Sequence, residues 1–532
     1  MVIAPRAGFS AALGAIAGVT GLQHIAVAQS PGETTVLGPF TGHYAKLHPA
    51  NEKPHLLAYY GTDLGWSYEH GGQIHFLFGD TTVNEHGDPI ARAALDDVFG
   101  TIPLADWPDP ARIAAGSIPL IRLGQKAGST EMAALDPGQP MESFKTPLGG
   151  FSNGSREFAL FYTSKPKGCR ADADCPGGLT CDTGLGFVGE PYDKPAGLTV
   201  ACVDGTPACA ADTMVDSAGK PIEGSGFCSD PTSSIWSQTN VGRVGGVALT
   251  QLVGIRSTTD PALYTNTRQW VTNKFANAAL RASGAGANRR VLLWGRPGFI
   301  GVNARGRTMG LYFAYVDMPT GPEYSWNVHY FTGTDAKGAP QFSANEKDAV
   351  AVDLDASRAG VQATEAHDIV DQMSIVWVAH LKKWLMLYGG GMTKIPMPPL
   401  LPSCGVLEYF TGAECKDVVL GNGAIRLRTA DEPWGPWSPP QDVLAGGNPD
   451  DPVPRDQYGV GGVLYHPACT RESCAPRTSS RQLSPGEYGF LYGVNIIESW
   501  IKPVGRDVDV IWNASTWDPY RVVLLRTRIR AR

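Results

Sequence analysis

The stretch GTDLGWSYEHGGQIHFLFGDT, residues 61–81, predicts two β-strands joined by a turn at His70-Gly71-Gly72. Paired glycines between two strand-like runs are typical of a hairpin. The second run contains Phe76-Leu77-Phe78-Gly79, which is apolar at successive positions and ends in an aromatic residue followed by glycine. Such a short continuous run fits a strand that is covered on both faces.

Four further runs share this character. They are Leu160-Phe161-Tyr162, Leu292-Leu293-Trp294-Gly295, Leu385-Met386-Leu387-Tyr388-Gly389 and Phe490-Leu491-Tyr492-Gly493. Any one of them could be a buried helix segment, but the repetition favours stacked sheets, as in the blades of a β-propeller. Their spacing exceeds the roughly 45 residues of an ordinary blade, so insertions are expected between them. The best candidate for a short helix is Thr272 to Ala282.

Composition supports an all-β chain. Of 532 residues only 18% are charged, whereas Gly (64) and Pro (41) are abundant, as expected for many strands joined by turns. The net charge of −7 has no basic block behind it, which argues against a nucleic-acid partner. No apolar run after the N-terminal region approaches the ~20 residues that a membrane-spanning helix needs.

The N-terminus has the pattern of an export signal. Arg6 provides a positive charge, an apolar stretch follows, and Ala26-Val27-Ala28 matches a small-x-small cleavage site. We therefore predict a signal peptide over residues 1–28 and a mature protein that is secreted, periplasmic or on the cell surface. An ordinary disordered N-terminus is the alternative.

Ten cysteines agree with an oxidising compartment. Six of them lie within residues 166–230, a stretch rich in Gly, Pro and Asp: Cys169, Cys175, Cys181, Cys202, Cys209 and Cys228. A zinc site is disfavoured because no CxxC pair occurs and no histidine lies among them. We predict a disulfide-stapled insertion, for which six cysteines allow 15 connectivities. It serves as a surface excursion or as a partner-binding module.

Two aspartates are the candidate catalytic residues. Asp63 lies near the start of the first predicted strand and Asp80 near the end of its partner, so both belong to the same edge of the hairpin. Glycosidic cleavage needs two carboxyl groups, one to protonate the leaving oxygen and one to activate water or attack carbon. The alternatives are that these aspartates cap turns or bind calcium. No cofactor is expected, with a structural calcium ion left open.

A serine motif points elsewhere. Gly150-Phe-Ser152-Asn-Gly154 matches GxSxG, the pattern of a hydrolase nucleophile elbow. An elbow needs a helix after the serine, but the residues that follow, Phe158 to Tyr162, have strand character. We therefore expect Ser152 to be a loop residue.

Four segments resemble a known family. They are Gly61-Thr-Asp-Leu-Gly65, Phe76-Leu-Phe-Gly-Asp-Thr81, Thr429-Ala-Asp-Glu-Pro-Trp-Gly-Pro-Trp437 and Ser515-Thr-Trp-Asp-Pro-Tyr-Arg-Val-Val523. They are similar to the propellers of the DUF4185 family, grouped with the endo-D-arabinanases of glycoside hydrolase family 183. The similarity runs from about His55 to Arg530, interrupted by the insertion.

The resemblance implies a five-bladed β-propeller over residues 50–532 and an inverting attack on D-arabinofuranosyl linkages. It also implies that Asp63 and Asp80 are the catalytic pair, with acid and base unassigned, and that the polysaccharide partner is mycobacterial-type arabinogalactan. One departure stands out, because Asp371-Gln372 occupies the place of a Gly-Glu pair in many relatives. The nearby Glu365, His367 and Asp368 could substitute for the missing glutamate, and the alternative for each is a place in a solvated loop.

Five more residues are candidates for substrate binding: Trp66, His466, Tyr492, Asn495 and Glu498. Trp66 could stack on a sugar face, and the other four surround the fifth apolar run, where they could face a central channel. For the last four, local structural hydrogen bonding is the alternative.

Three functions remain open from the sequence. The chain is a glycoside hydrolase acting on D-arabinan, a catalytically silent carbohydrate-binding or adhesin-like propeller, or a hydrolase of another furanoside such as L-arabinan or fructan. Propellers host many activities, so fold alone cannot choose among these. A monomer is expected in each case.

Overall fold

The computed structural model describes part of the chain. The described residues are 30–41, 61–82, 94–95, 97–109, 111–112, 118–124, 145–155, 157–163, 168–169, 171–174, 180–182, 226–229, 235–244, 247–254, 275, 277–285, 289–296, 310–318, 328–344, 348–352, 354, 370–389, 424–444, 491–516 and 521–531. The predicted signal peptide, residues 1–28, lies outside them.

Five sheets contain four or five strands each, and each is named here by its innermost strand. The β2 sheet has β2 (Gly61–His70), β3 (Gln73–Thr82), β5 (Val98–Pro103) and β6 (Arg122–Leu123), with β4 (Ala94–Leu95) beside β3. The β7 sheet has β7 (Lys145–Ser152), β8 (Glu157–Thr163), β13 (Val247–Gly254) and β12 (Ile235–Val244). The β14 sheet has β14 (Asn277–Ser283), β15 (Arg290–Arg296), β16 (Tyr312–Asp317), β17 (Val328–Thr334) and β18 (Pro340–Ser343).

The last two large sheets follow along the chain. The β19 sheet has β19 (Met373–Val378), β20 (Lys383–Gly389), β21 (Ile425–Ala430) and β22 (Gln441–Leu444). The β23 sheet has β23 (Leu491–Ile496), β25 (Asp507–Thr516), β26 (Arg521–Arg530) and β1 (Ser30–Pro39), with β24 (Lys502–Val504) beside β25. A short 3-10 helix, η9 (Glu498–Trp500), follows β23.

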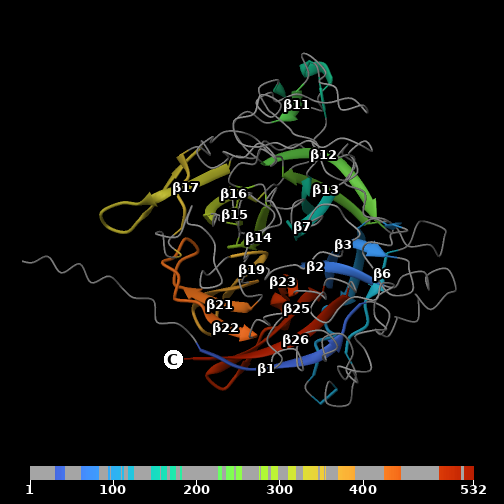
Figure 1. Cartoon of the computed structure of the whole chain (residues 1–532), viewed down its shortest axis with the longest axis vertical. Coiled ribbons are helices and arrows are strands. Elements are labelled where there is room, and N and C mark those ends of the chain that lie inside the picture. The colour runs from blue at the N-terminus through green and yellow to red at the C-terminus, as the bar shows by residue number, and fades with distance from the viewer. Residues whose placement is uncertain are drawn as a thin grey trace, which may run out of the picture.

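The five sheets surround a common axis. Contacts between inner strands link β2 to β7, β7 to β14, β14 to β19, β19 to β23 and β23 back to β2. Figure 1 looks along this axis and shows the same five strands gathered at the centre of the ring. The predicted propeller arrangement is confirmed.

The number of regular blades differs from the prediction. Four sheets are antiparallel throughout, namely those of β2, β14, β19 and β23. In the β7 sheet, β13 pairs with β8 in parallel, which breaks the up-and-down meander of a blade. The chain between β8 and β12 holds the small sheet β9 (Gly168–Cys169), β11 (Gly226–Ser229) and β10 (Thr180–Asp182). Among the described strands, regular blades therefore number four, and the cysteine-rich segment lies where the meander is broken.

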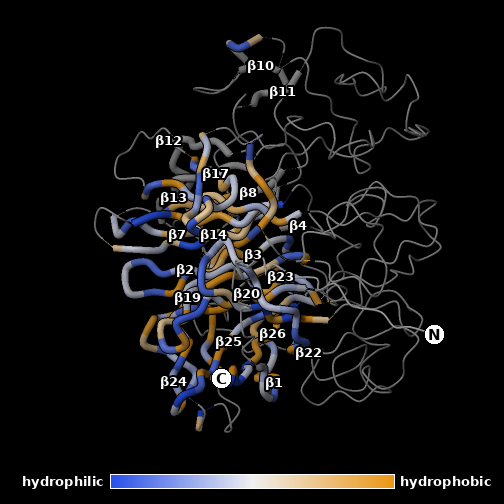
Figure 2. Tube along the Cα trace, turned by 90° about the vertical axis from the view of Figure 1, so that its left-hand side faces the viewer, coloured by the Kyte–Doolittle hydropathy of each residue, from blue (hydrophilic) through white to orange (hydrophobic). Residues whose placement is uncertain are grey.

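The continuous apolar runs are explained by packing on both faces of each sheet. In β20, Leu385 and Leu387 pack toward the β23 sheet, whereas Met386 and Tyr388 pack toward Trp294 of the β14 sheet. Side chains alternate between the two faces of a strand, so a strand between two sheets needs apolar residues at every position. In Figure 2 the hydrophobic colour is accordingly concentrated in the strands.

The two ends of the described chain close the ring. β1 pairs antiparallel with β26, so the first strand forms the outer edge of the last sheet. This strand lies before residue 50, where the sequence placed the start of the propeller. It has no aromatic run to signal it, because an edge strand is covered on fewer sides.

Two sequence expectations are corrected. The segment Thr272 to Ala282 contains no helix in its described part, since Asn277–Ser283 is β14 and pairs with β15 along its full length. Tertiary pairing here overrides the helix preference of the alanines. The five apolar runs are also not equivalent, because the first four lie in second strands, whereas the last lies in the inner strand β23. Within the described residues, no helix has the length and hydropathy of a membrane span.

Candidate active site

Asp63 and Asp80 face each other at one end of the β2–β3 hairpin. Thr62 pairs with Thr81, and the next pair is Leu64 with Phe78, so Gly79 and Asp80 together oppose Asp63. An extra residue on one strand is a β-bulge, which redirects side chains and is common near active sites. The prediction that both aspartates share one edge of the hairpin is confirmed by this register.

The environment of Asp63 is built to hold a carboxylate in one position. Its side chain is buried, and Oδ2 accepts a hydrogen bond of 2.6 Å from the hydroxyl of Tyr492. Gly79 leaves room for the other oxygen, since a Cβ atom at this position would collide with Oδ1 of Asp63 and with the side chain of Leu64. Asp80 is partly exposed. The site thus pairs one buried, anchored carboxyl with one that is more accessible.

The backbone beside Asp63 adopts a rare conformation. Leu64 has a φ of 62°, in the left-handed region that side chains other than glycine seldom occupy. Its N–H donates to Oγ of Ser515 at 2.7 Å, and its carbonyl accepts from Nδ2 of Asn513 at 2.8 Å. Both partners lie on β25, so the second strand of the β23 sheet holds the strained segment in place. Strain of this kind, about 1–3 kcal/mol, clusters at functional sites.

Tyr492 is positioned by its neighbour and by β19. Gly493 has a φ of 60°, and a Cβ atom there would lie 3.1 Å from Cα of Leu64. Its N–H donates to Oε1 of Gln372 at 2.6 Å. Gln372 is buried, so this departure from the expected Gly-Glu pair keeps an oxygen acceptor facing β23. The first residues of β2 and β23 are thereby joined to Gln372, the residue directly before β19, in one network.

A buried ion pair stands beside this network. Nη1 of Arg296, the last residue of β15, lies 3.0 Å from Oδ1 of Asp371, and both side chains are almost fully buried. The same Nη1 donates to the carbonyl of Val370 at 2.9 Å. Burial raises the pKa of Asp371 above the ordinary value of 3.8, while the charge of Arg296 opposes that rise.

The remaining predicted site residues do not gather with Asp63. Asn495 is buried, where Oδ1 accepts from the N–H of Ser67 at 3.3 Å and Nδ2 donates to Asn513 at 2.9 Å. These bonds are the structural alternative that the sequence left open. Glu498 lies past the other end of β23, in an ion pair of 3.1 Å with Arg281. Trp66 is only 7% exposed, so it offers little ring face to a ligand.

Several predicted positions lie outside the described residues. His466, Glu365, His367 and Asp368 belong to this group. Among the described residues, no three side chains of His, Cys, Asp or Glu form a cluster that could hold a metal ion.

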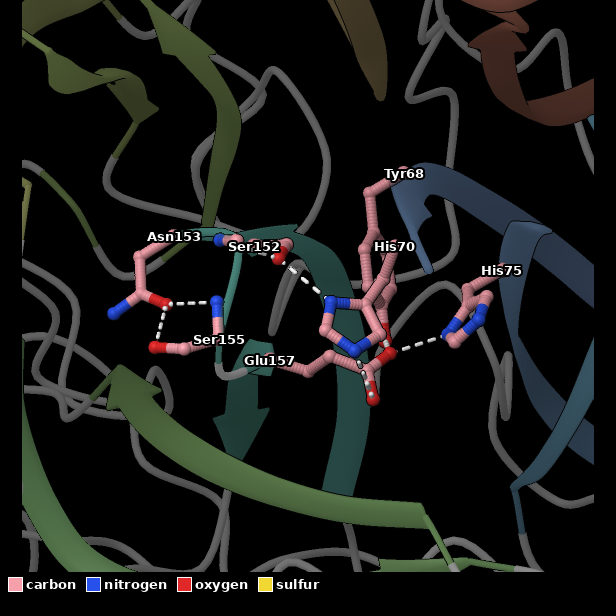
Figure 3. Close-up of polar contacts among 8 residues, drawn as sticks. Tyr68, His70, His75, Ser152, Asn153, Ser155 and Glu157 are labelled. Atoms are coloured by element: carbon pink, nitrogen blue, oxygen red, sulfur yellow. Dashed lines mark hydrogen bonds and ion pairs between the residues drawn. The ribbon is translucent and has the colours of Figure 1, made fainter. Parts of the chain in front are cut away.

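A second polar cluster lies at the opposite end of the inner strands (Figure 3). Glu157, the first residue of β8, is buried and accepts a hydrogen bond of 3.1 Å from the hydroxyl of Tyr68 and a shorter contact from Nδ1 of His75. Burial and the carboxylate of Glu157 raise the pKa of Tyr68 well above its ordinary value, which keeps the phenol a donor. This cluster joins the β2 and β7 sheets.

Ser152 and His70 extend the cluster to the surface. Oγ of Ser152 lies 2.8 Å from Nδ1 of His70 and accepts from the N–H of Gly154 at 2.9 Å, while Nε2 of His70 lies 3.8 Å from Glu157. Ser152 ends β7 and is followed by a turn into β8, so the helix required by a nucleophile elbow is absent here. The serine motif thus marks a strand-to-strand turn and no elbow, but Ser152 is the last residue of β7 rather than the loop residue that was predicted.

The sequence missed most of this supporting structure. Arg296, Glu157 and His75 were not among the candidates, although charged residues inside otherwise apolar strands are a signal of buried pairs. Their partners come from other sheets, and nothing local in the sequence identifies them.

Comparisons with known proteins do not assign a family. No family model matches the chain, and no curated protein matches it. Among solved structures, it is similar to a presumed hydrolase from Bacteroides ovatus with a TM-score of 0.31 and 10% identity, covering 88% of this chain and 86% of that one. It is also similar to an α-L-arabinofuranosidase from Podospora anserina, solved with cellotriose, with a TM-score of 0.31 and 9% identity, covering 94% and 97%.

A third structure is a family 62 glycoside hydrolase solved with xylotriose, with a TM-score of 0.30 and 8% identity, covering 94% of this chain and 98% of that one. Similarity at this level carries no inference about the activity of this chain.

Proposed function

We propose that the protein is an exported glycoside hydrolase that cleaves furanosidic glycan, with D-arabinan as its substrate. Asp63 and Asp80 are its catalytic carboxyl groups. The β7 sheet, despite its parallel pair, serves as the fifth blade of the propeller, because its inner strand fills the place between β2 and β14. The protein acts as a monomer outside the membrane.

The observation that carries this proposal is the bulge that sets Gly79 and Asp80 opposite Asp63. Two carboxyl groups at the same end of the hairpin that holds the inner strand β2 meet the first requirement of glycosidic cleavage. The strained backbone at Leu64 and the hydrogen bond from Tyr492 add the rigidity that a catalytic group needs. A turn cap would need neither.

In the proposed reaction, one carboxyl acts as the general acid and the other as the general base. One, protonated, donates its proton to the glycosidic oxygen as the bond to the anomeric carbon breaks. The other, ionised, takes a proton from water as the water oxygen bonds to that carbon. The Tyr492 hydroxyl fixes the Asp63 carboxyl in one rotamer through its hydrogen bond to Oδ2. The substrate is a neutral chain of pentofuranose units, and its hydrolysis by two carboxyl groups needs no cofactor.

The direct test is release of D-arabino-oligosaccharides from purified mycobacterial arabinogalactan by the mature protein. Asp63→Asn and Asp80→Asn should each lower the rate about 10²–10⁴-fold, the usual contribution of acid–base catalysis. The matched control is Asp317→Asn, whose carboxylate is 65% exposed and should have no effect. A folded wild type that releases nothing would reject D-arabinan as substrate.

A leaving-group test then assigns the two roles. On an aryl arabinofuranoside, whose leaving group needs no protonation, the variant lacking the acid should regain most of its rate. The variant lacking the base should instead be rescued by azide, which replaces the activated water. If neither aspartate variant responds in either assay, the pair is not catalytic.

A binding-only propeller is the second candidate. The observation favouring it is the separate sheet β9–β11–β10, which pairs with no large sheet among the described strands. In that case deletion of residues 166–230 would remove partner capture, and wild type would bind glycan without turnover.

A further inference from the structure

We propose that the end of the propeller opposite Asp63 holds a second ligand site, a pocket for a neutral sugar of about monosaccharide size. The site does not depend on Asp63 or Asp80, because it uses different residues at the other ends of the inner strands. Its ligand class follows from the volume, the charge balance and the mixed lining of one cavity.

The cavity lies where several sheets meet. It has a volume of about 260 Å³ and is lined by the last residues of β2 and β7, by residues at and after the end of β14, and by η9. Asp63, Gln372 and Tyr492 lie near the first residues of their strands, so the cavity and the candidate active site are at opposite ends. Pockets for drug-sized ligands usually measure about 300–1,000 Å³. This one therefore suits a single ring or little more.

The charged groups of the wall balance one another. Arg281 and Arg289 are matched by Glu69 and Glu498, so the lining carries no net charge. Arg281 lies 3.1 Å from Glu498, Arg289 donates to the carbonyl of Ser152 at 2.7 Å, and Ser499 donates to Glu69. A charged ligand would have to displace one of these partners and leave the other uncompensated. A neutral ligand can bind without breaking them.

The wall also offers what a sugar requires. Hydroxyl groups donate and accept, and the lining supplies guanidinium donors, carboxylate acceptors and the hydroxyls of Ser67, Ser152 and Ser499. Between these lies apolar surface from the half-buried Ala282, which suits the C–H face of a sugar ring, whereas Ile74 and Phe151 also line the cavity but are each only 1% exposed. A purely apolar ligand would leave the polar groups of the wall without hydrogen-bond partners.

The test measures binding only, by calorimetry, on the Asp63→Asn background so that no turnover occurs. The probes are neutral sugars (D-arabinose, D-xylose, D-glucose, D-mannose and D-galactose) together with galacturonic acid and galactosamine, which carry opposite charges on the galactose ring. At least one neutral sugar should bind, and the two charged sugars about tenfold or more weaker than galactose. If none of the neutral sugars binds, or if a charged analogue binds most tightly, the proposal is overturned.

Two variants locate the site. Ala282→Trp fills the cavity and should abolish sugar binding, whereas Ala285→Trp, the same change at an exposed position three residues along, should not. Because Ala282→Trp could disturb β14, a second variant uses an exposed side chain. Glu498→Gln leaves the charge of Arg281 uncompensated, so galacturonic acid should gain at least about tenfold relative to galactose. An unchanged ratio would contradict the site.

Failure of this proposal is distinguishable from failure of the hydrolase proposal. Loss of arabinan cleavage with retained sugar binding would remove only the first function. If arabinan is cleaved but no sugar binding is lost in Ala282→Trp, only the second ligand site is rejected.

Discussion

The two ends of the inner strands are built in different ways. At the Asp63 end, Asp63 and Gln372 are buried, Asp80 is partly exposed, and hydrogen bonds from other sheets hold the left-handed backbone at Leu64 and Gly493. At the opposite end, Arg281, Glu69 and Glu498 surround a cavity and are more exposed. Strain and precise anchoring suit bond making and breaking, whereas balanced, adaptable charges suit binding. The difference is what supports the proposals of chemistry at one end and sugar binding at the other.

The largest expected effect comes from removing Arg296 at the Asp63 end. Arg296→Gln leaves the carboxyl of Asp371 buried without its counter-ion, which should lower the free energy of unfolding by about 3–5 kcal/mol. Urea titration at pH 7 measures this change. A loss below about 1 kcal/mol would show that the pair behaves like a surface ion pair.

The partner variant, Asp371→Asn, should behave differently with pH. Since the pKa of Asp371 is raised above 3.8 in the folded protein, this carboxyl destabilises wild type as pH rises through the window from 3.8 to the raised pKa. Asparagine does not ionise, so the stability of the variant relative to wild type should increase as pH rises from 3.5 to 7. A relative stability that falls over this range would contradict the raised pKa.

A substitution at Gly79 tests whether the position of the Asp63 carboxyl matters, because it leaves the carboxyl itself unchanged. Gly79→Ala places a Cβ atom against Asp63 and Leu64, and the displaced carboxyl should lower the rate of arabinan cleavage about 10²-fold. The matched control is Gly389→Ala, which follows the apolar run of β20 as Gly79 follows that of β3. Its Cβ would meet only ordinary contacts of 3.6 Å or more. Equal rates of arabinan cleavage in Gly79→Ala and Gly389→Ala would show that the position of the Asp63 carboxyl does not matter for catalysis.

A substitution of Glu157, at the end opposite Asp63, should change stability but not cleavage. Glu157→Gln keeps the shape of the buried side chain but loses one of its acceptor interactions with Tyr68 and His75. The free energy of unfolding should therefore fall by about 1–3 kcal/mol. Arabinan cleavage at a temperature where the variant is folded should be unchanged. A loss of arabinan cleavage comparable to that of Asp63→Asn would contradict the assignment of catalysis to the Asp63 end.

The smallest expected effect is that of Tyr492→Phe. The variant keeps the ring and removes only the hydrogen bond to Asp63, so it should lower kcat by about tenfold, the equivalent of one hydrogen bond. A kcat equal to that of wild type would make Tyr492 a packing residue only.

The sequence predicted the hairpin and the character of the strands well, because both depend on local pattern. The turn at His70-Gly71-Gly72 and the apolar run at Phe76–Phe78 carry their own signals. It predicted the wrong structure for Asn277–Ser283, since the pairing of β14 with β15 is decided by distant residues. The parallel pair β8–β13 was likewise invisible, as was the packing that buries Trp66.

The site was partly within reach for the same reason. Asp63 and Asp80 could be placed together because a hairpin relates them locally. The partnership of Gln372 with Gly493 joins positions more than a hundred residues apart, and the separation of Glu498 from Tyr492 depends on the direction in which β23 crosses the ring. These relations follow from the closure of the sheets rather than from spacing.

The division of function between the two ends is tested most directly by measuring two activities on two variants in parallel. Asp63→Asn and Ala282→Trp are each assayed for release of oligosaccharides from D-arabinan and for binding of neutral sugars. We expect a crossed result, in which Asp63→Asn binds sugar but does not cleave, and Ala282→Trp cleaves but no longer binds at the second site. Cleavage that survives in Asp63→Asn, or is lost equally in both folded variants, would contradict the division of function between the two ends.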